Sequence, residues 1–355
     1  MSSAVKRANL VLLVVLVATI SLNLAWEHQV ILTPMVKLTD YYDFAARAPL
    51  GYRILPALLC RLLSWGHSNF ATGLNEPLDS YYSIFQLVID TISLFVGFVF
   101  IAKIARQLNP RLSSTIILPF AGAAALMIVV FGYFMVPNKA FFYPYDFPDL
   151  CIATIIFYLC IRGGNAVEIA LPAAVFVATL NKETAVFYSG LYLVFSIERH
   201  RDWKRVAFVL VASAAAFVLA RATVLLLVRK LGPGVATSGP QFEIQFGYTM
   251  QQFRNPLFVF ALLNICSYLY LPVWAIRKRL DRTDMFILAM VLAWVIIMSM
   301  VGIFRQLRLF VPASVMLFLI IARHLSEVMG AVVPRIARSF DELPAGGKPL
   351  DGQSS

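Results

Sequence analysis

The sequence predicts an all-α, polytopic membrane protein, a bundle of about ten transmembrane helices. Of its 355 residues, 60% are hydrophobic and 14% are charged, and the mean hydropathy is +0.78. Soluble domains carry roughly a quarter charged residues, so this composition excludes an ordinary soluble globule. Apolar runs alternate with short basic connections, as they do in proteins that cross a membrane several times.

Ten apolar runs predict the helices of a single transmembrane domain over residues 1–330. The first run follows two cations and has no evident small-x-small cleavage site, so we expect a retained helix instead of a signal peptide. The polar residues 331–355, with Pro and Gly, are expected to form a disordered cytoplasmic tail. The predicted helices cover 8–26, 81–102, 114–135, 148–162, 167–180, 184–197, 206–228, 257–276, 284–303 and 308–325.

The basic connections fix the expected orientation of the bundle. "KIARQLNPR", "RGGN", "ERHRDWKR" and "RKRLDR" fall on one side with both termini if the ten helices alternate. Lys and Arg accumulate in cytoplasmic loops, so this side is predicted to be cytoplasmic. The net charge of +11 then reflects membrane orientation, and no nucleic-acid partner is expected.

The opposite, outer side receives a long first loop and several polar turns. The loop 27–80 contains "ILPALLCRLLSW", which is too short to span and predicts an interfacial or re-entrant helix. The runs 148–162 and 167–180 would cover roughly 20 Å of a hydrocarbon core about 30 Å thick. The "NKET" turn at 181–184 is therefore expected below the outer surface, in a cavity that opens outward.

Outer loops seldom carry Lys and Arg, and ionisable groups at membrane depth are costly and usually functional. Arg305 and Arg308 are three residues apart and share a helical face, which favours anion binding over a simple outer anchor. The candidate outer charges are Asp40, Asp43, Arg47, Arg53, Lys139, Asp146, Asp149, Lys182, Glu183, Arg305 and Arg308.

Structural interpretations stand beside these functional ones. "DFPDL" is also typical of a helix start, with Asp146 near the N-cap and Asp149 favoured by the helix dipole. Asn181 can cap the following helix while Lys182 and Glu183 pair with each other. "DYYD" and "AFFYPYDF" also suit an interfacial aromatic belt, and the loop 229–256 suits either a lid or a plain connection.

Few residues suggest a metal or a cofactor. The four cysteines lack metal spacing and are read as free thiols, and the four scattered histidines make a histidine-based metal or relay site an unfavoured interpretation. Asp90 and Arg221 lie within predicted helices, where pairing across helices is the expected role. Carboxylates can hold a divalent metal, but no ligand spacing requires one, so no cofactor is expected.

These features together resemble the GT-C superfamily, the membrane glycosyltransferases that use polyprenyl-phosphate sugars. The chain is also similar to a group of bacterial multi-pass membrane proteins with an Arg-x-Leu-Pro stretch, a Tyr-Asp pair and an Asn-(Arg/Lys)-Glu-Thr turn. Here these motifs read 53–56, Tyr145-Asp146 and 181–184. Two features depart from the superfamily: the first-loop acids are Asp40-x-x-Asp43 instead of an adjacent D-x-D, and no C-terminal soluble domain follows.

The resemblance implies a hexosyl- or pentosyltransferase in a bacterial cytoplasmic membrane, with its active side periplasmic. Asp43 would act as the base of an inverting transfer, with Asp40 as its alternate or neighbour. The donor would be a polyprenyl-phosphate-linked sugar, and the acceptor a glycan, lipid or protein. The implied phosphate clamp comprises Arg53, Lys182, Arg305 and Arg308, and the other implied substrate-binding residues are Tyr145, Asp146, Asp149, Asn181 and Glu183.

Two other functions use the same cationic outer site. A transporter or flippase of a lipid-linked or anionic solute would bind it without chemistry, although carriers often contain inverted repeats, and no repeat is visible here. An outer-leaflet polysaccharide polymerase or ligase would use the arginines against a lipid diphosphate.

Overall fold

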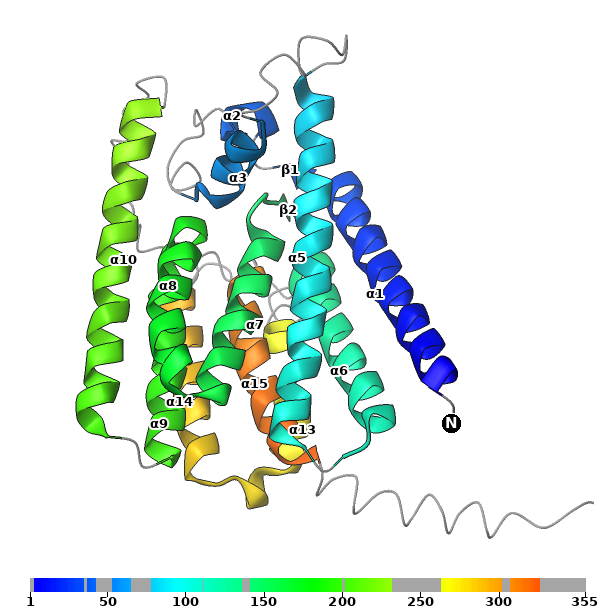
Figure 1. Ribbon diagram of the computed structural model, residues 1–355, viewed down its shortest axis with the longest axis vertical. Helices are drawn as coiled ribbons and strands as arrows, with labels where there is room; N and C mark the ends of the chain where they lie inside the picture. The colour runs from blue at the N-terminus through cyan, green and yellow to red at the C-terminus, as the bar shows by residue number, and fades with distance from the viewer. Residues whose placement is uncertain are drawn as a thin grey trace, which may run out of the picture.

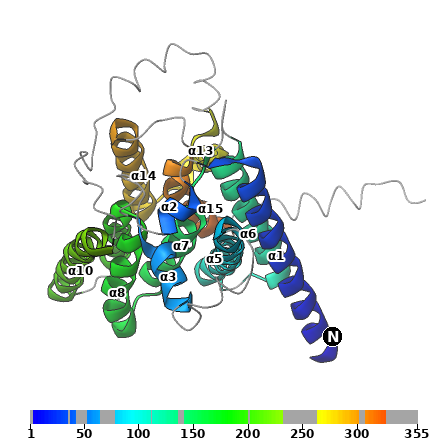
Figure 2. The same cartoon turned by 90° about the horizontal axis from the view of Figure 1, so that it is seen from above.

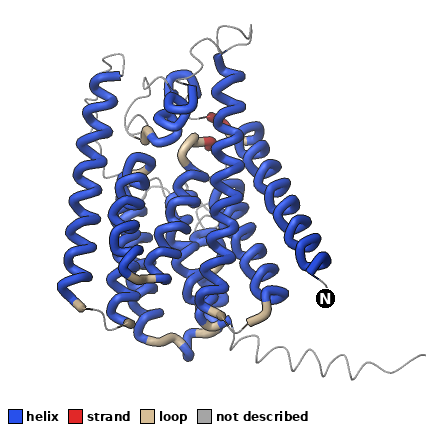
Figure 3. The backbone as a smooth tube through the Cα atoms, viewed as in Figure 1, coloured by secondary structure: helices blue, strands red, loops and turns tan. Residues whose placement is uncertain are grey.

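The computed structural model describes residues 3–34, 37–42, 53–64, 78–110, 112–135, 141–199, 202–231, 263–301 and 307–325. These residues form a bundle of helices (Figures 1 and 3). Where they are described, nine of the ten predicted apolar runs are helical over most of their length, and the run 257–276 is interrupted. The tail predicted at 331–355 lies outside the described residues, as do Asp43 and Arg305.

The element bounds match the predicted runs closely. The α-helices are α1 (Ser3–Ile31), α2 (Leu38–Tyr42), α3 (Leu55–Ser64), α5 (Leu78–Leu108), α6 (Ser114–Val129), α7 (Asp146–Arg162), α8 (Asn165–Asn181), α9 (Gly190–Glu198), α10 (Trp203–Leu231), α13 (Tyr270–Ala275), α14 (Arg282–Val301) and α15 (Val311–Arg323). A π-helical turn, η2 (Val130–Phe134), extends α6, and the 3-10 segments are η3 (Glu183–Ser189), η4 (Ile265–Tyr268), η5 (Arg277–Arg279) and η6 (Leu307–Phe310).

Five of the described helices are long and apolar enough to cross a membrane. They correspond to Val11–Val30, Tyr82–Leu108, Ser114–Phe134, Trp203–Lys230 and Arg282–Met300. The helices α7 and α8 have 17 residues each, so they are short, as the sequence predicts. Their upper ends stop below the upper ends of α5 and α10, and α2 and α3 lie above them (Figure 1).

The first loop is shorter than predicted, because α1 continues to Ile31 and α5 already begins at Leu78. No proline or glycine interrupts 27–31, so the helix extends past the predicted end. Its continuation places His28 inside the bundle. The short helix predicted from "ILPALLCRLLSW" is present as α3 and packs against α2, α5 and α8.

Two short strands join the end of α1 to the segment before α7. β1 (Thr33–Pro34) and β2 (Phe141–Phe142) pair in parallel, with Thr33 opposite Phe141. The fold is therefore helical apart from this small ladder within the described residues. The ladder holds the upper end of α1 close to the first turn of α7.

The run predicted at 257–276 is not one continuous helix where it is described. Cys266, Ser267 and Tyr268 adopt left-handed backbone angles, with φ of 55°, 54° and 60°. This conformation costs non-glycine residues roughly 1–2 kcal/mol each. The Ser267 hydroxyl lies 3.2 Å from that of Ser314, and this buried contact ties the turn to α15.

The centre of the bundle is a close-packed apolar core. α15 lies in its middle (Figure 2) and is buried over almost its whole length. Gly132 lets η2 approach α15, because a Cβ built there would lie 2.6 Å from Cγ2 of Val311. Cys60, Cys151, Cys160 and Cys266 are free thiols, as predicted.

At the lower end in Figure 1, ionic contacts join α9, α14 and α15. Arg323 reaches Glu198 at 3.0 Å and Asp281 at 2.6 Å, and His324 lies 2.7 Å from the buried Asp284. The Asp281 and Asp284 carboxylates also accept each other's backbone N–H groups. This reciprocal bonding is the arrangement of a capping box at the start of α14.

Candidate functional site

The upper part of the bundle brings together charged and polar side chains from five separate segments. We call this group the upper cluster. It draws on the start of α3, the segment before α7, the first turn of α7, the turn between α8 and η3, and the 3-10 segment η6. Its members from the sequence prediction are Arg53, Tyr145, Asp146, Asp149, Asn181, Lys182, Glu183 and Arg308.

Arg53 and Glu183 form the ion pair nearest to α2 and α3. Their Nη2 and Oε1 atoms lie 3.2 Å apart and Nε lies 3.4 Å from Oε2, a two-point contact between side chains that are only 11% and 12% exposed. The guanidinium also sits over the Tyr145 ring, 4.3 Å from its centroid. Cation–π contact and bidentate pairing both favour arginine over lysine here.

The ion pair sets the charge state of both partners. Burial raises the pKa of Glu183, but the attraction of Arg53 outweighs burial and leaves the pKa below its ordinary value. Burial lowers the pKa of Arg53, and the charge of Glu183 reverses this and raises it. The charge of Arg221 on α10 also acts on Glu183. Both groups of the pair therefore stay charged near neutral pH.

Arg308 lies against Asp146 and two tyrosines. Its Nη1 is 3.4 Å from Asp146 Oδ2, and its guanidinium carbon is 3.0 Å from the centroid of the Tyr143 ring. Burial lowers the pKa of Arg308, but the charge of Asp146 outweighs burial and raises it. Tyr145 lies between the two arginines, because the Arg308 guanidinium is also 6.0 Å from its ring centroid.

Asp149 binds two partners one turn deeper along α7. Lys182 Nζ donates to Oδ2 at 2.7 Å, and the Tyr188 hydroxyl donates to Oδ1 at 3.0 Å. Asn181 donates through its side-chain amide to the Tyr145 carbonyl at 3.1 Å. The turn between α8 and η3 is therefore bonded to the start of α7 through both of these side chains.

The helix-start interpretation of "DFPDL" is confirmed, because α7 begins at Asp146 and carries Asp146 and Asp149 in its first turn. The capping interpretation of Asn181 is wrong. The residue that caps α7 is Tyr145, without a side-chain bond, while the Asp146 carboxylate reaches Arg308. Asn181 is the last residue of α8 and caps nothing after it. Lys182 and Glu183 do not pair with each other, because Lys182 has an extended backbone, with φ −157°, and the two side chains find partners on different segments.

His28 is a member of this site that the sequence prediction missed. It is fully buried, with Nδ1 3.8 Å from Asp90 Oδ2 and Nε2 3.7 Å from Asp146 Oδ2. Aromatic rings surround it, including Phe147 at 4.3 Å and Phe142 at 5.0 Å between ring centroids. Both distances exceed hydrogen-bond length, and neither ring nitrogen has a hydrogen-bond partner among the described residues.

Gln86 connects His28 and Asp90 to the surrounding segments. Its amide donates to Asp90 Oδ1 and to the Pro144 carbonyl, each at 2.8 Å. Its side-chain oxygen accepts from the Tyr42 hydroxyl. Asp90 thus contacts His28 on α1. The sequence offered one weak signal for His28, a histidine directly after an apolar run, but nothing that linked it to Asp90.

Asp40 lies apart from the upper cluster. It is on α2 with an exposed side chain, while its neighbours Tyr41 and Tyr42 are buried. The Tyr41 hydroxyl donates to the carbonyl of Arg53, so α2 is fastened over the cluster by its tyrosines. Among the described residues, no group of three or more His, Cys, Asp or Glu side chains could hold a metal ion.

The upper cluster gathers three cations with aromatic faces under the cover of α2 and α3. Each cation is held in place by a carboxylate, which fixes the direction of its donors. Comparison of the chain with protein-family models and with curated protein sequences finds no match.

Proposed function

We propose that the chain crosses a bacterial cytoplasmic membrane ten times, with both termini in the cytoplasm. The connections that join α7 to α8, α9 to α10 and α13 to α14 lie together at the lower end (Figure 1). These are the basic connections of the sequence, and basic loops mark the cytoplasmic side. The upper cluster then faces the periplasm, at partial membrane depth. The five helices already long enough to span, together with α7, α8, α9, α13 and α15, give the ten crossings.

On this basis we propose a membrane glycosyltransferase of GT-C type that transfers a sugar from a polyprenyl-phosphate donor. The observation that carries the proposal is the convergence of Arg53, Lys182 and Arg308 beside the tyrosines 143 and 145. A phosphodiester requires cationic donors, and a sugar ring packs well on aromatic faces.

In the proposed reaction, the acceptor hydroxyl attacks the anomeric carbon from the face opposite the phosphate. The new carbon–oxygen bond forms while the bond to the donor phosphate oxygen breaks, and the lipid phosphate leaves with the bonding electrons. A carboxylate takes the hydroxyl proton. Asp43 remains our proposed base, with Asp40 beside it on α2 as the alternate.

The cations would stabilise the charge that develops on the leaving phosphate. Arg53, Lys182, Arg308 and Arg305 are the proposed clamp. Within the protein, Arg53, Lys182 and Arg308 pair with the carboxylates of Glu183, Asp149 and Asp146. Asn181 links the end of α8 to Tyr145, directly before α7. A phosphate would compete with those carboxylates for the same donors, so the affinity for phosphate would depend on the strength of each ion pair.

The proposal is tested by sugar transfer in membranes that contain the full chain. Radiolabelled polyprenyl-phosphate sugars are supplied with membrane acceptors, and transfer is compared for wild type, Asp43→Asn and Asp40→Asn. We expect Asp43→Asn to lose transfer at unchanged protein level. Glu27→Gln is the matched control, because Glu27 is an exposed acid on α1 near the same end. Full transfer by both aspartate variants would exclude the proposed base.

A second candidate is a proton-coupled carrier of an anionic or lipid-linked solute. His28 between Asp90 and Asp146 favours it, since buried ionisable chains form proton relays in transporters. Counterflow of solute in vesicles without a covalent product would establish the carrier and exclude the transferase. Supplying a lipid-diphosphate oligosaccharide as a separate donor tests the third function, because only a polymerase or ligase would transfer from it.

A further inference from the structure

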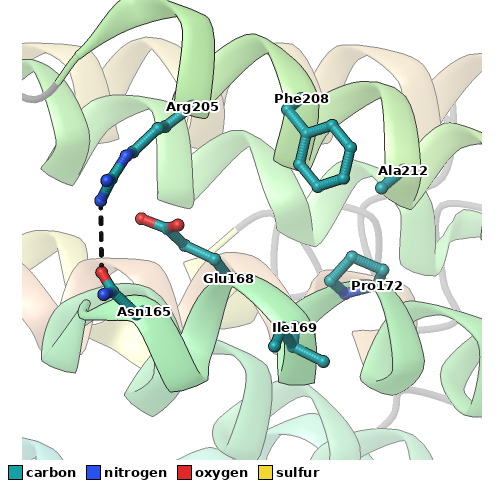
Figure 4. Close-up of a pocket in the computed structure, with 7 residues that line it drawn as sticks. All are labelled: Asn165, Glu168, Ile169, Pro172, Arg205, Phe208 and Ala212. Atoms are coloured by element: carbon teal, nitrogen blue, oxygen red, sulfur yellow. Dashed lines mark hydrogen bonds between the residues drawn. The ribbon is translucent and has the colours of Figure 1, made fainter.

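A hollow lies between the lower halves of α8 and α10, away from the upper cluster. Its volume is about 510 Å³, within the range of roughly 300–1,000 Å³ found for small-molecule sites. The lining residues are Asn165, Glu168, Ile169, Pro172, Arg205, Phe208 and Ala212. Figure 4 shows the three polar side chains at one end of this groove and the apolar ones at the other.

The order of polar and apolar residues is built into both helices. On α8, Asn165 and Glu168 precede Pro172, and on α10, Arg205 precedes Phe208 and Ala212 at helical spacing. Both helices run upward from the lower end (Figure 1). The polar end of the groove therefore lies at the lower end of the bundle, and the apolar end lies one to two turns above it.

This polarity matches an amphiphile with its headgroup at the lower surface and its chains pointing into the bilayer. Ile169 is 80% exposed and Phe208 71% exposed, so both can contact acyl chains. Trp203 is 62% exposed at the start of α10, and tryptophan at a helix end marks the membrane interface. The polar end of the groove is therefore at headgroup level.

The two charges at the polar end have opposite sign. Arg205 Nη1 donates to Asn165 Oδ1 at 3.4 Å, and Glu168 Oε1 accepts from the Tyr192 hydroxyl at 3.4 Å. A guanidinium recognises a phosphate, and a carboxylate accepts hydrogen bonds from a primary ammonium. A headgroup that carries both groups a few bonds apart satisfies both side chains.

We propose that this groove binds an ethanolamine phospholipid, with its phosphate on Arg205, its ammonium on Glu168 and its chains along Ile169 and Phe208. A choline headgroup cannot donate hydrogen bonds to Glu168, because its nitrogen carries no hydrogen. A glycerol headgroup has no cation, so its net negative charge is repelled by Glu168. The proposal depends on the chain lying in a membrane and is independent of glycosyl transfer.

Native mass spectrometry of the full chain in detergent tests the site. The protein is titrated separately with dioleoyl lipids that carry ethanolamine, choline or glycerol headgroups. We expect the ethanolamine lipid to be retained roughly three- to tenfold more strongly than the choline and glycerol lipids. One charged hydrogen bond at a partly exposed site contributes a factor of about this size. Equal or stronger retention of the other two lipids by the wild type would overturn the proposal.

Charge variants separate the two recognition elements. Glu168→Gln should abolish the preference for the ethanolamine lipid, and Glu168→Lys should reverse it toward the glycerol lipid. Arg205→Gln should weaken the binding of all three lipids. Arg229→Gln is the matched control, because Arg229 is exposed on the same helix at its other end. A preference that survives both Glu168 variants contradicts the proposed ammonium contact. Displacement of the lipid by glycerophosphoethanolamine at equal concentration contradicts the acyl-chain contact.

Discussion

Lys182 and Asp149 form a buried ion pair that joins the turn after α8 to the first turn of α7, with Nζ 2.7 Å from Oδ2. The pair is closed by the Tyr188 hydroxyl on the second carboxylate oxygen. Burial makes such a pair costly to break, because the remaining partner keeps its charge without compensation. The pair therefore fixes the depth and direction of the turn that also carries Glu183.

The first prediction concerns this pair. Lys182→Gln should lower the free energy of unfolding by about 3–5 kcal/mol, since Asp149 is left charged and buried. Thermal unfolding of the detergent-solubilised protein measures the change. The double variant Lys182→Gln with Asp149→Asn should recover much of the loss, because it removes the uncompensated charge.

Lys230→Gln provides the control for that experiment. Lys230 is an exposed cation at the upper end of α10, and surface changes of this kind stay within about 0.5 kcal/mol. A Lys182→Gln variant as stable as Lys230→Gln would mean that the ion pair contributes little to the fold.

The second prediction concerns pH. The pKa of Glu183 is below its ordinary value because Arg53 outweighs burial. A carboxyl group with a depressed pKa adds stability above its unfolded pKa of about 4.3 and loses it as pH falls through the folded pKa. The stability difference between wild type and Glu183→Gln should thus be constant from about pH 7 to 5 and shrink at more acidic pH.

Thermal melts of both proteins across that pH series measure the difference. Arg53→Gln, which leaves Glu183 buried without its cation, should reverse the acid dependence, because burial then raises the pKa of Glu183 and protonation stabilises the fold. A difference that widens on acidification would show that Glu183 is not stabilised as a carboxylate by Arg53.

The third prediction concerns His28. Replacing it by Phe keeps an aromatic ring among Phe142 and Phe147 but removes the polar ring that lies between the Asp90 and Asp146 carboxylates. We expect a loss of about 3–5 kcal/mol, the usual cost of removing one partner from buried charges. Adding Asp90→Asn should restore part of the stability. An equally stable His28→Phe variant would show that packing alone explains the buried histidine.

The fourth prediction concerns the contact between η2 and α15. Gly132→Ala places a Cβ 2.6 Å from Val311 Cγ2, and overpacking of this kind costs about 1–3 kcal/mol. Val311→Ala in the same chain should relieve the clash. Gly122→Ala on α6 is the matched control, because no atom lies within 4 Å of the Cβ built there. It should be neutral or stabilising by up to about 1 kcal/mol, since alanine favours helix. Equal melting temperatures for the two alanine variants would contradict the close approach.

Much of the helical framework follows from the sequence alone. Apolar runs longer than a membrane is thick can satisfy their backbone only as helices, so the positions of α1, α5, α6, α10 and α14 were predictable. The gathering of "DFPD", "NKET" and the segment before α15 at one end was also predictable, because alternating helices return there. The extension of α1 past Trp26 was not, because hydropathy falls before the helix ends.

The choice of partners within the upper cluster was decided only by the tertiary structure. Neighbouring residues along a chain point in different directions, so adjacency of Lys182 and Glu183 gave no guide to their pairing, which is with Asp149 and Arg53. His28 has no sequence neighbour among its partners, since Asp90 and Asp146 lie 62 and 118 positions away. The sequence determined which groups are near the upper end of the bundle. Helix packing and the β1–β2 ladder determined which groups touch, because ion pairs form over a few ångströms and depend on side-chain direction.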